Sequence, residues 1–412
     1  MNNSLSLSLL KNQKIFWIIS AILLFLIFSP NLFLDFKGMD DYTFFHQYSL
    51  NDLKNVWIDN FTVAIDPIIP PGYRPLMIYI AAFIFNIFGF NSFPVFSLLV
   101  LILIIKGLLS LKLFLYYVKN KFLALIGLLL AITNFDNLTH HFWAAEIASN
   151  ICDIFILLTV IFLTKKKYYV YSLVCIIIAV LIKETAIPLL LLLPIVFWVK
   201  KEKKLFWYSF LIPIGYFTLR TLFLHTTRYD LSLYQMVHNT SWGMLSIFNW
   251  PFIYNYVNFF QSNYFCLLSI IILNLSIIVI ISLSHKKLIE NWFLILSAIL
   301  FMGTFPFTAG ARTTYFYILF LLILTVKLLE NLNKKYQIAF SLIMAIAIMA
   351  NVYSTDKYIY ERYRSNSVYM YQDKIDILTG CGMNNYFIYR DKYREQLQYL
   401  QNRLNKDGRG SF

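Results

Sequence analysis

The sequence predicts an all-α protein whose helices cross a membrane many times, and three observations support this prediction. Of the 412 residues, 59% are hydrophobic and only 14% are charged, whereas charged residues make up about 25% of an ordinary soluble domain. The apolar residues are gathered into long blocks, as in membrane helices. Aromatic residues reach 18%, which suits a bundle that is exposed to lipid and has wet ends. A water-soluble enzyme, a disordered chain and a coiled coil are therefore excluded.

Each apolar block is expected to form one helix. In chain order the blocks lie at residues 15–34, 73–90, 93–118, 121–135, 146–164, 168–182, 186–199, 205–224, 264–284, 291–308, 313–329 and 336–352. The first block follows Lys11 and Lys14 and has no small-residue cleavage site behind it, so we interpret it as a retained signal anchor. Blocks 121–135 and 168–182 are short for a hydrocarbon core that needs roughly 20 residues. We expect both to end below the outer surface and to leave a cavity there.

The positions of the basic residues predict the topology. Clusters of Lys lie at 119–121, 165–167, 200–204, 286–287 and 334–335, and cytoplasmic loops collect such residues. With a cytoplasmic N-terminus, all five clusters fall inside only if one early block does not cross. The best candidate is block 73–90, which would form a juxtamembrane or re-entrant helix that starts and ends outside. About eleven spans then remain, and the net charge of +14 reflects topology instead of a nucleic-acid partner.

Two parts follow from this topology. Residues 1–352 form the transmembrane domain, whose first outer segment, 35–92, carries juxtamembrane helices. Leu50, Leu53, Trp57 and Phe61 repeat at helical spacing there, which predicts an amphipathic helix on the membrane surface. Residues 353–412 form a small extracytoplasmic tail that is helical near 391–405.

The outer segments hold the candidate catalytic acids. Asp40 and Asp41 are adjacent and directly follow the first span. Partial desolvation so close to the hydrocarbon would raise the pKa of one carboxyl toward that of a useful base; the alternative is an ordinary acidic loop.

A second outer connection contains His140, His141 and Glu146. Asp153 lies two turns after Glu146 on the same helical face, and an ionisable group at that depth is by default a functional-site hypothesis. No third ligand stands at a metal-like spacing, and the four cysteines are far apart, so the sequence predicts no metal site.

Three cations are expected on the same side of the membrane. Arg74 opens block 73–90, Lys183 precedes Glu184 in an outer turn, and Arg312 begins a helix. Each has a purely structural alternative: Arg74 as an interfacial anchor, Lys183 and Glu184 as an ion pair. A base facing several cations fits a lipid-linked phosphate or diphosphate donor, because the cations would stabilise charge on the leaving phosphate while an Asp takes the acceptor's proton. Lys106 lies mid-span without an outer partner, and we expect it to pair within the bundle or to reach the inner face.

Taken together, these motifs resemble a known family. Five motifs occur in order over roughly residues 15–330. They are an acidic pair after the first span, an Arg-Pro-Leu helix start at Arg74, a His-rich turn before Glu146 and Asp153, the Lys183-Glu184 turn, and Arg312 before an aromatic helix. The pattern looks like that of GT-C-fold glycosyltransferases, and most like the protein O-mannosyltransferase-like and tetratricopeptide-linked O-mannosyltransferase branch.

The resemblance implies an inverting sugar transfer from a polyprenyl-phosphate donor on the extracytoplasmic face of a membrane, and we expect the bacterial inner membrane. By position, Asp40 or Asp41 would be the base, and Asp40 is slightly favoured. Arg74, Lys183 and Arg312 match positions near the donor phosphate, and His141, Glu146 and Asp153 match the second outer loop. A divalent cation stays open, because relatives differ in metal dependence. The acceptor would be a glycan, a lipid or a protein hydroxyl.

Three other functions are compatible with the sequence. A saccharide polymerase of the O-antigen type would use similar chemistry with a growing glycan as acceptor. A transporter or flippase for a lipid-linked saccharide is expected to have ionisable groups near the midplane and repeated halves, whereas the candidate groups here cluster outside. The last alternative is a membrane protein without catalytic activity.

Overall fold

The computed structural model describes residues 12–34, 48–58, 73–89, 91–134, 141, 143–223, 236, 264–284, 288–303 and 314–359. Within these ranges the chain is helical and contains no strand, as the sequence predicts. The helices agree closely with the apolar blocks, which shows that hydrophobic content alone locates most of them.

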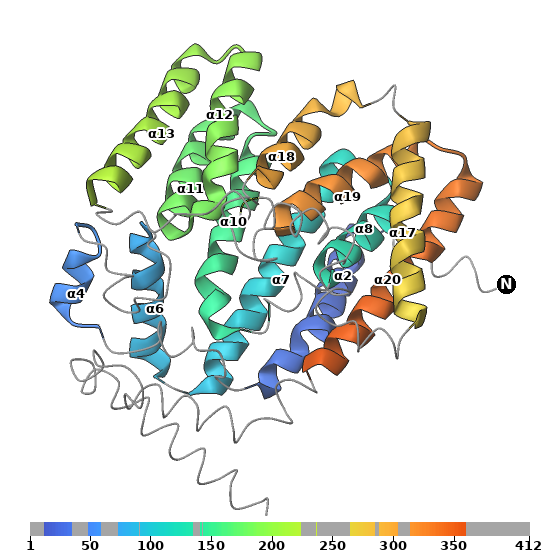
Figure 1. Cartoon of the computed structure of the whole chain (residues 1–412), viewed down its shortest axis with the longest axis horizontal. Coiled ribbons are helices and arrows are strands. Elements are labelled where there is room, and N and C mark those ends of the chain that lie inside the picture. The colour runs from blue at the N-terminus through green and yellow to red at the C-terminus, as the bar shows by residue number, and fades with distance from the viewer. Residues whose placement is uncertain are drawn as a thin grey trace, which may run out of the picture.

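The first half of the described chain contains α7, one of its two 26-residue helices. Its elements are α2 (Gln13–Phe28), η1 (Ser29–Phe33), α4 (Leu50–Asn55), α6 (Pro75–Phe88), α7 (Ser92–Tyr117) and α8 (Lys121–Thr133). Helix α7 runs through the middle of the molecule and packs against α2, α8 and α10 (Figure 1). The amphipathic helix expected around residues 50–61 is shorter than predicted: α4 ends at Asn55, and Trp57 follows in a turn.

The second half begins with four helices that stand together at one side of the molecule (Figure 1). They are α10 (Ile147–Phe162), α11 (Tyr169–Ile182), α12 (Ile187–Val199) and α13 (Lys203–Phe223), and the 3-10 turns η2 (Ala144–Glu146), η3 (Lys166–Tyr168) and η4 (Glu184–Ala186) precede α10, α11 and α12. Helix α6 packs against the α10–α11 pair.

The remaining helices cover the opposite side (Figure 1). They are α17 (Tyr264–Leu283), α18 (Trp292–Met302), preceded by the turn η6 (Ile289–Asn291), α19 (Thr314–Glu330) and α20 (Lys334–Ile359). Helix α18 ends six residues before the predicted end of its block, with Gly303 as its C-cap, and α20 continues beyond the domain boundary that we expected at residue 352.

Four segments of the described chain are long and apolar enough to cross a membrane: Gln13–Phe33, Ser92–Tyr117, Ala144–Phe162 and Lys334–Tyr353. Four further apolar helices have only 10–17 residues: Pro75–Phe88, Lys121–Thr133, Glu184–Val199 and Ile289–Met302. The predicted membrane helices are therefore confirmed in general, while the count of about eleven spans stays a prediction.

The distribution of apolar side chains also fits a membrane bundle. Phe16, Phe114 and Phe320 are fully buried, and α7 approaches α2 closely at Gly107, where an added Cβ would lie 2.7 Å from Leu24. Small residues at such crossings are typical of membrane helices. Many large apolar side chains also face outward along α2 and α13, among them Leu26 and Trp207, which are each 59% exposed. Lipid would cover surfaces of this kind.

Helices α8 and α11 are short, as predicted. They contain 13 and 14 residues, which corresponds to about 20 Å at 1.5 Å per residue, against a hydrocarbon core of about 30 Å. At the end of α11 the polar run Lys183-Glu184-Thr185 interrupts the apolar sequence, and Pro188 sits in the first turn of α12. This break places charged side chains inside the bundle.

Candidate functional site

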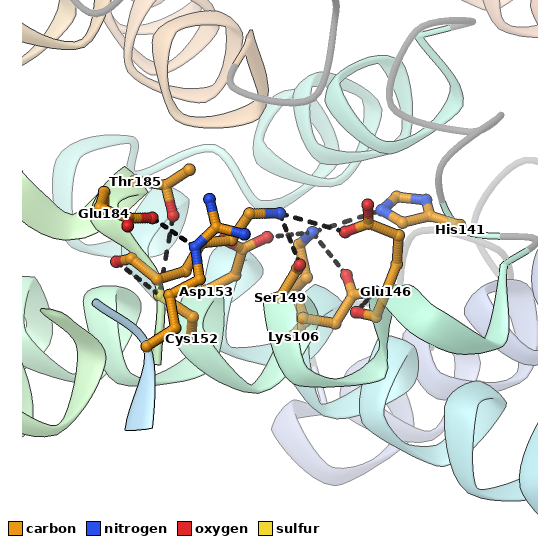
Figure 2. A network of polar contacts seen from close by, with 11 residues as sticks. Lys106, His141, Glu146, Ser149, Cys152, Asp153, Glu184 and Thr185 are labelled. Atoms are coloured by element: carbon orange, nitrogen blue, oxygen red, sulfur yellow. Dashed lines mark hydrogen bonds and ion pairs between the residues drawn. The ribbon is translucent and has the colours of Figure 1, made fainter. Parts of the chain in front are cut away.

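The candidate site is a continuous polar network where α10, the α11–α12 turn, α7 and the start of α6 meet (Figure 2). The network contains three ion pairs, and each joins segments far apart in the sequence. The pairs are Lys106–Asp153, Lys183–Glu146 and Arg74–Glu184. All six side chains are at most 18% exposed, so their charges are held largely away from bulk water.

Lys106 lies at the centre of the first part of the network. Its ammonium group lies 2.6 Å from Oδ2 of Asp153 and donates to Oδ1 of Asn150 at 3.0 Å. It also lies 3.3 Å from Nε2 of His141, which must accept because an ammonium group has only donors. The ring of Tyr315 covers it at 3.8 Å, within the range of a cation–π contact. Lys106 therefore pairs within the bundle, as expected, but it also joins the predicted outer residues, which the sequence did not indicate.

A hydrogen-bonded chain extends this part of the network to α19. The Ser110 hydroxyl donates to the carbonyl of Lys106 at 2.9 Å. It therefore accepts from the Tyr315 hydroxyl, 2.7 Å away. Lys106 of α7 is thus held by side chains of α10 and α19 and by the segment that contains His141.

The backbone carbonyl of His141 accepts from Nδ2 of Asn31 at 3.1 Å, and the His141 ring makes an edge contact with Phe28. His141 is consequently fixed between the end of α2 and the Lys106 ammonium group. The network thereby ties the C-terminal end of α2 to the centre of the bundle.

Lys183 connects the turn after α11 with the start of α10. Its ammonium group donates to Oγ of Ser149 at 2.6 Å and to Oε2 of Glu146 at 3.3 Å. Glu146 is the N-cap of α10, where a carboxylate is favoured by the helix dipole, and its backbone carbonyl accepts from Asn150. Beneath the turn, Sγ of Cys152 contacts the carbonyl of Ala179 at 3.3 Å, which fixes the end of α11.

Arg74 and Glu184 form the most exposed of the three pairs. Nε of Arg74 donates to Oε2 of Glu184 at 2.6 Å. Arg74 is the N-cap of α6, and Pro75 occupies the first helical position, where its missing N–H costs nothing. The other oxygen of Glu184, Oε1, is buried and receives no hydrogen bond from any residue that the structure describes.

Helix α13 closes this end of the network with aromatic side chains. The ring of Tyr73 lies 6.4 Å from that of Tyr216 and stacks on that of Phe223 at 6.0 Å. Burial raises the pKa of Tyr73 above its ordinary value, so its hydroxyl stays protonated at neutral pH. Arg220, on the next turn of α13 after Tyr216, has no ion pair or hydrogen bond among the described residues.

The charges of this region nearly balance. The cations are Arg74, Lys106, Lys183 and Arg220, and the carboxylates are those of Glu146, Asp153 and Glu184. Four positive and three negative charges leave a surplus of one positive charge within the described part of the site. Such a surplus favours a bound anion over a bound cation.

The structure brings six of the predicted site residues into this network: Arg74, His141, Glu146, Asp153, Lys183 and Glu184. Asp40, Asp41, His140 and Arg312 lie outside the described residues, so their place relative to the network stays a prediction. Of the three cations predicted to hold phosphate, the two that the structure describes, Arg74 and Lys183, are each paired with a carboxylate.

Several residues at or beside the site were not predicted from the sequence: Lys106 as a site residue, Ser149, Asn150, Tyr216, Arg220 and Tyr315. An Arg near the C-terminal end of the apolar block 205–224 was the signal available for Arg220. Among the described residues, no group of three or more His, Cys, Asp and Glu is arranged to hold a metal ion.

Comparison with known proteins adds no relative. No protein-family model, no curated protein and no solved structure matches the chain. The function therefore has to be argued from the chemistry of the site.

Proposed function

We propose that this protein is an integral membrane glycosyltransferase that moves a sugar from a polyprenyl-phosphate donor to an acceptor hydroxyl. The observation that carries the proposal is the convergence of four cations and three carboxylates within an apolar bundle, around the start of α10 and the turn that follows the short helix α11. Ionisable groups are costly at such depth and usually mark a substrate path or a reaction centre.

The phosphate part of the proposal rests on charge. Arg220 brings a guanidinium group to the site without a carboxylate partner among the described residues, and a guanidinium group matches a phosphate with two parallel N–H donors. Arg74 acts on the same hydroxyl, that of Tyr216, as Arg220 does, and Arg74 and Lys183 would add to the positive potential once the acids share their bonds with a substrate. An amphiphilic donor would reach this place along the lipid-facing surfaces of α6 and α13.

The catalytic part of the proposal rests on the family resemblance. Asp40 or Asp41 would take the proton from the acceptor hydroxyl, the acceptor oxygen would form the new bond to the anomeric carbon, and the bond from that carbon to the phosphate oxygen would break. The cations would stabilise the charge that develops on the departing phosphate. The configuration at the anomeric carbon would invert.

The proposal includes a GT-C-like architecture with about eleven spans and an extracytoplasmic site. Two features support this orientation. The Lys clusters at 165–167 and 200–204 lie at the ends of α10–α13 opposite to the site, and such clusters favour the cytoplasm. In addition, α6 packs against α11, and Arg74 at its start bonds Glu184 in the turn after α11, which suits a juxtamembrane helix on the predicted outer side.

A transporter of a lipid-linked saccharide is the second candidate, and one observation favours it. The Lys106–Asp153 pair links the segments Ser92–Tyr117 and Ala144–Phe162, which are both long enough to cross a membrane, and paired ionisable groups within spans occur in transporters. A saccharide polymerase would differ from the proposed enzyme in its acceptor alone.

The experiment that tests the proposal is transfer from a purified lipid-linked donor. The full chain in lipid nanodiscs is given polyprenyl-phosphate sugars with a labelled sugar and a glycan acceptor, and the labelled product is measured. We expect product with the wild type, none with Asp40→Asn or with Asp41→Asn, whichever is the base, and full activity with the control Asp52→Asn. Full activity of both variants would contradict the base assignment. Movement of intact labelled lipid across the bilayer without transfer would establish the transporter instead.

A further inference from the structure

Two buried oxygen atoms at the α13 end of the site have no hydrogen-bond partner among the described residues. They are Oε1 of Glu184 and the hydroxyl oxygen of Tyr216. Tyr216 is 4% exposed, so bulk water does not reach it. Buried polar groups are nearly always hydrogen-bonded, and an unsatisfied one in a folded protein calls for a bound water or ligand.

The two atoms belong to the same place in the fold. The charges of Glu184, Arg220 and Arg74 all lie close enough to the Tyr216 hydroxyl to act on it electrostatically. The ring of Tyr73 contacts that of Tyr216 and stacks on Phe223, which forms an aromatic wall beside the polar atoms. A carboxylate, a phenol, guanidinium groups and aromatic rings are thus gathered at one point.

Their chemistry limits what they can bind. The carboxylate oxygen of Glu184 only accepts hydrogen bonds, so its partner must carry a donor. The phosphodiester oxygens of a polyprenyl-phosphate sugar carry no proton at neutral pH and would be repelled by the carboxylate. A hydroxyl group meets both requirements, because it can donate to Glu184 while it accepts from the Tyr216 hydroxyl.

We infer that Glu184 and Tyr216 bind hydroxyl groups of the sugar that the lipid-linked donor carries, and that Arg220 lies on the phosphate side of the same donor. This inference rests on the proposed function and states which residues bind the sugar of the donor and which lie near its phosphate. Arg74 then positions Glu184 through their 2.6 Å hydrogen bond instead of holding the phosphate alone. Glu184 and Tyr216 become the residues that select the sugar.

Selection of this kind has a measurable consequence. A site built to hydrogen-bond a hydroxyl rejects an analogue without it, because the buried polar groups are then left unpaired. The wild type should therefore bind a sugar-bearing lipid phosphate about tenfold or more tightly than the bare lipid phosphate, which is the effect of one or two hydrogen bonds.

The test compares four probes on the full chain in detergent: a short-chain polyprenyl phosphate and its mannosyl, glucosyl and arabinosyl derivatives. Affinity is measured by ligand-dependent thermal stabilisation. Tyr216→Phe removes one oxygen atom, and the control Tyr208→Phe removes the same atom from an exposed position, 58% accessible, on the same helix. We expect Tyr216→Phe to reduce the preference for the best sugar probe to about one, with binding of the bare phosphate unchanged, and Tyr208→Phe to keep the preference.

The other outcomes distinguish a failure of the sugar-binding inference from a failure of the proposed function. An unchanged preference in Tyr216→Phe would overturn the inference, since the hydroxyl would then bind only water. Equal binding of bare and sugar-bearing probes by the wild type would overturn it too, while leaving lipid-phosphate binding in place. If the wild type binds none of the probes, the proposed function itself fails. Glu184→Gln provides a second variant: it is expected to lower the same preference, and a preference at the wild-type level would contradict the inference.

Discussion

Replacing Lys106 by methionine tests whether the buried charges act as one network. Lys106 and Asp153 have side chains that are 4% and 15% exposed, and their charged atoms lie 2.6 Å apart. Removing one member of a buried ion pair costs about 3–5 kcal/mol, because the other is left without its counter-charge. Lys183 also acts on Asp153 electrostatically. We therefore expect Lys106→Met to lower the free energy of unfolding by about 3 kcal/mol, at the low end of that range.

The double variant Lys106→Met/Asp153→Leu isolates the interaction between the two charges. Each single variant strands one buried charge, whereas the double variant strands neither. Replacement of a whole buried pair by apolar residues is often close to neutral. We expect the double variant to cost less than the sum of the single variants, with a coupling energy of about 2 kcal/mol or more.

Unfolding of the purified protein in mixed micelles, followed by circular dichroism as the share of denaturing detergent rises, measures these differences. Lys112→Met is the matched control, because Lys112 lies on the same helix, α7, and is exposed. A surface substitution of this kind usually changes stability by less than about 0.5 kcal/mol. If Lys106→Met costs no more than Lys112→Met, or if the costs of the single variants add in the double variant, the network does not hold the helices together.

Two further predictions concern packing and topology. Gly127→Ala should lower the free energy of unfolding by about 1–3 kcal/mol, because the new Cβ would lie 2.7 Å from Phe114 and 2.9 Å from Val326. Gly215→Ala has no atom within 4 Å of the new Cβ and should raise the free energy of unfolding by about 1 kcal/mol. If both substitutions change the free energy of unfolding equally in the same assay, the close packing at Gly127 is contradicted. A cysteine introduced at Asn91, in a variant without the native cysteines, should react with an impermeant reagent added outside intact cells. Labelling only after the cytoplasmic side is opened would mean that α6 crosses the membrane.

The helices could be predicted from the sequence because their signal is local. Apolar blocks begin and end at polar or helix-capping residues, such as Asn120, whose side chain accepts from the first N–H groups of α8. The same local reasoning located the short helices α8 and α11. It failed for α4, because the apolar spacing continues past Asn55, whereas Val56 is buried and the indole of Trp57 donates to the Tyr79 hydroxyl of α6. Tertiary contacts override the helical period at that point.

The site could be predicted only in part, because its contacts are long-range. Arg74 and Glu184 are 110 residues apart, and Lys106 and Asn150 are 44 residues apart. Sequence spacing predicted that Glu146 and Asp153 lie on one helical face, but it could not predict that Lys106 pairs with Asp153. Arg220 was missed because an Arg at the end of an apolar helix usually serves as an interfacial anchor.

The three ion pairs are more easily understood as parts of a binding site than as a source of stability. Buried pairs lose solvation that their mutual attraction only partly restores, so a well-packed apolar substitute is often as stable. In a bundle with abundant Leu and Ile, such substitutes would fit each of these positions. Two of the pairs also share one end of the short helix α11, and the least buried of the three, Arg74–Glu184, leaves Oε1 of Glu184 unsatisfied among the described residues. If the network served stability alone, its unsatisfied hydrogen-bond acceptor would be expected at the aqueous surface. Instead, Oε1 of Glu184 lies near Tyr216 and Arg220. A negatively charged ligand that also carries hydroxyl groups would pair with Arg220 and with the two unsatisfied oxygen atoms of Glu184 and Tyr216.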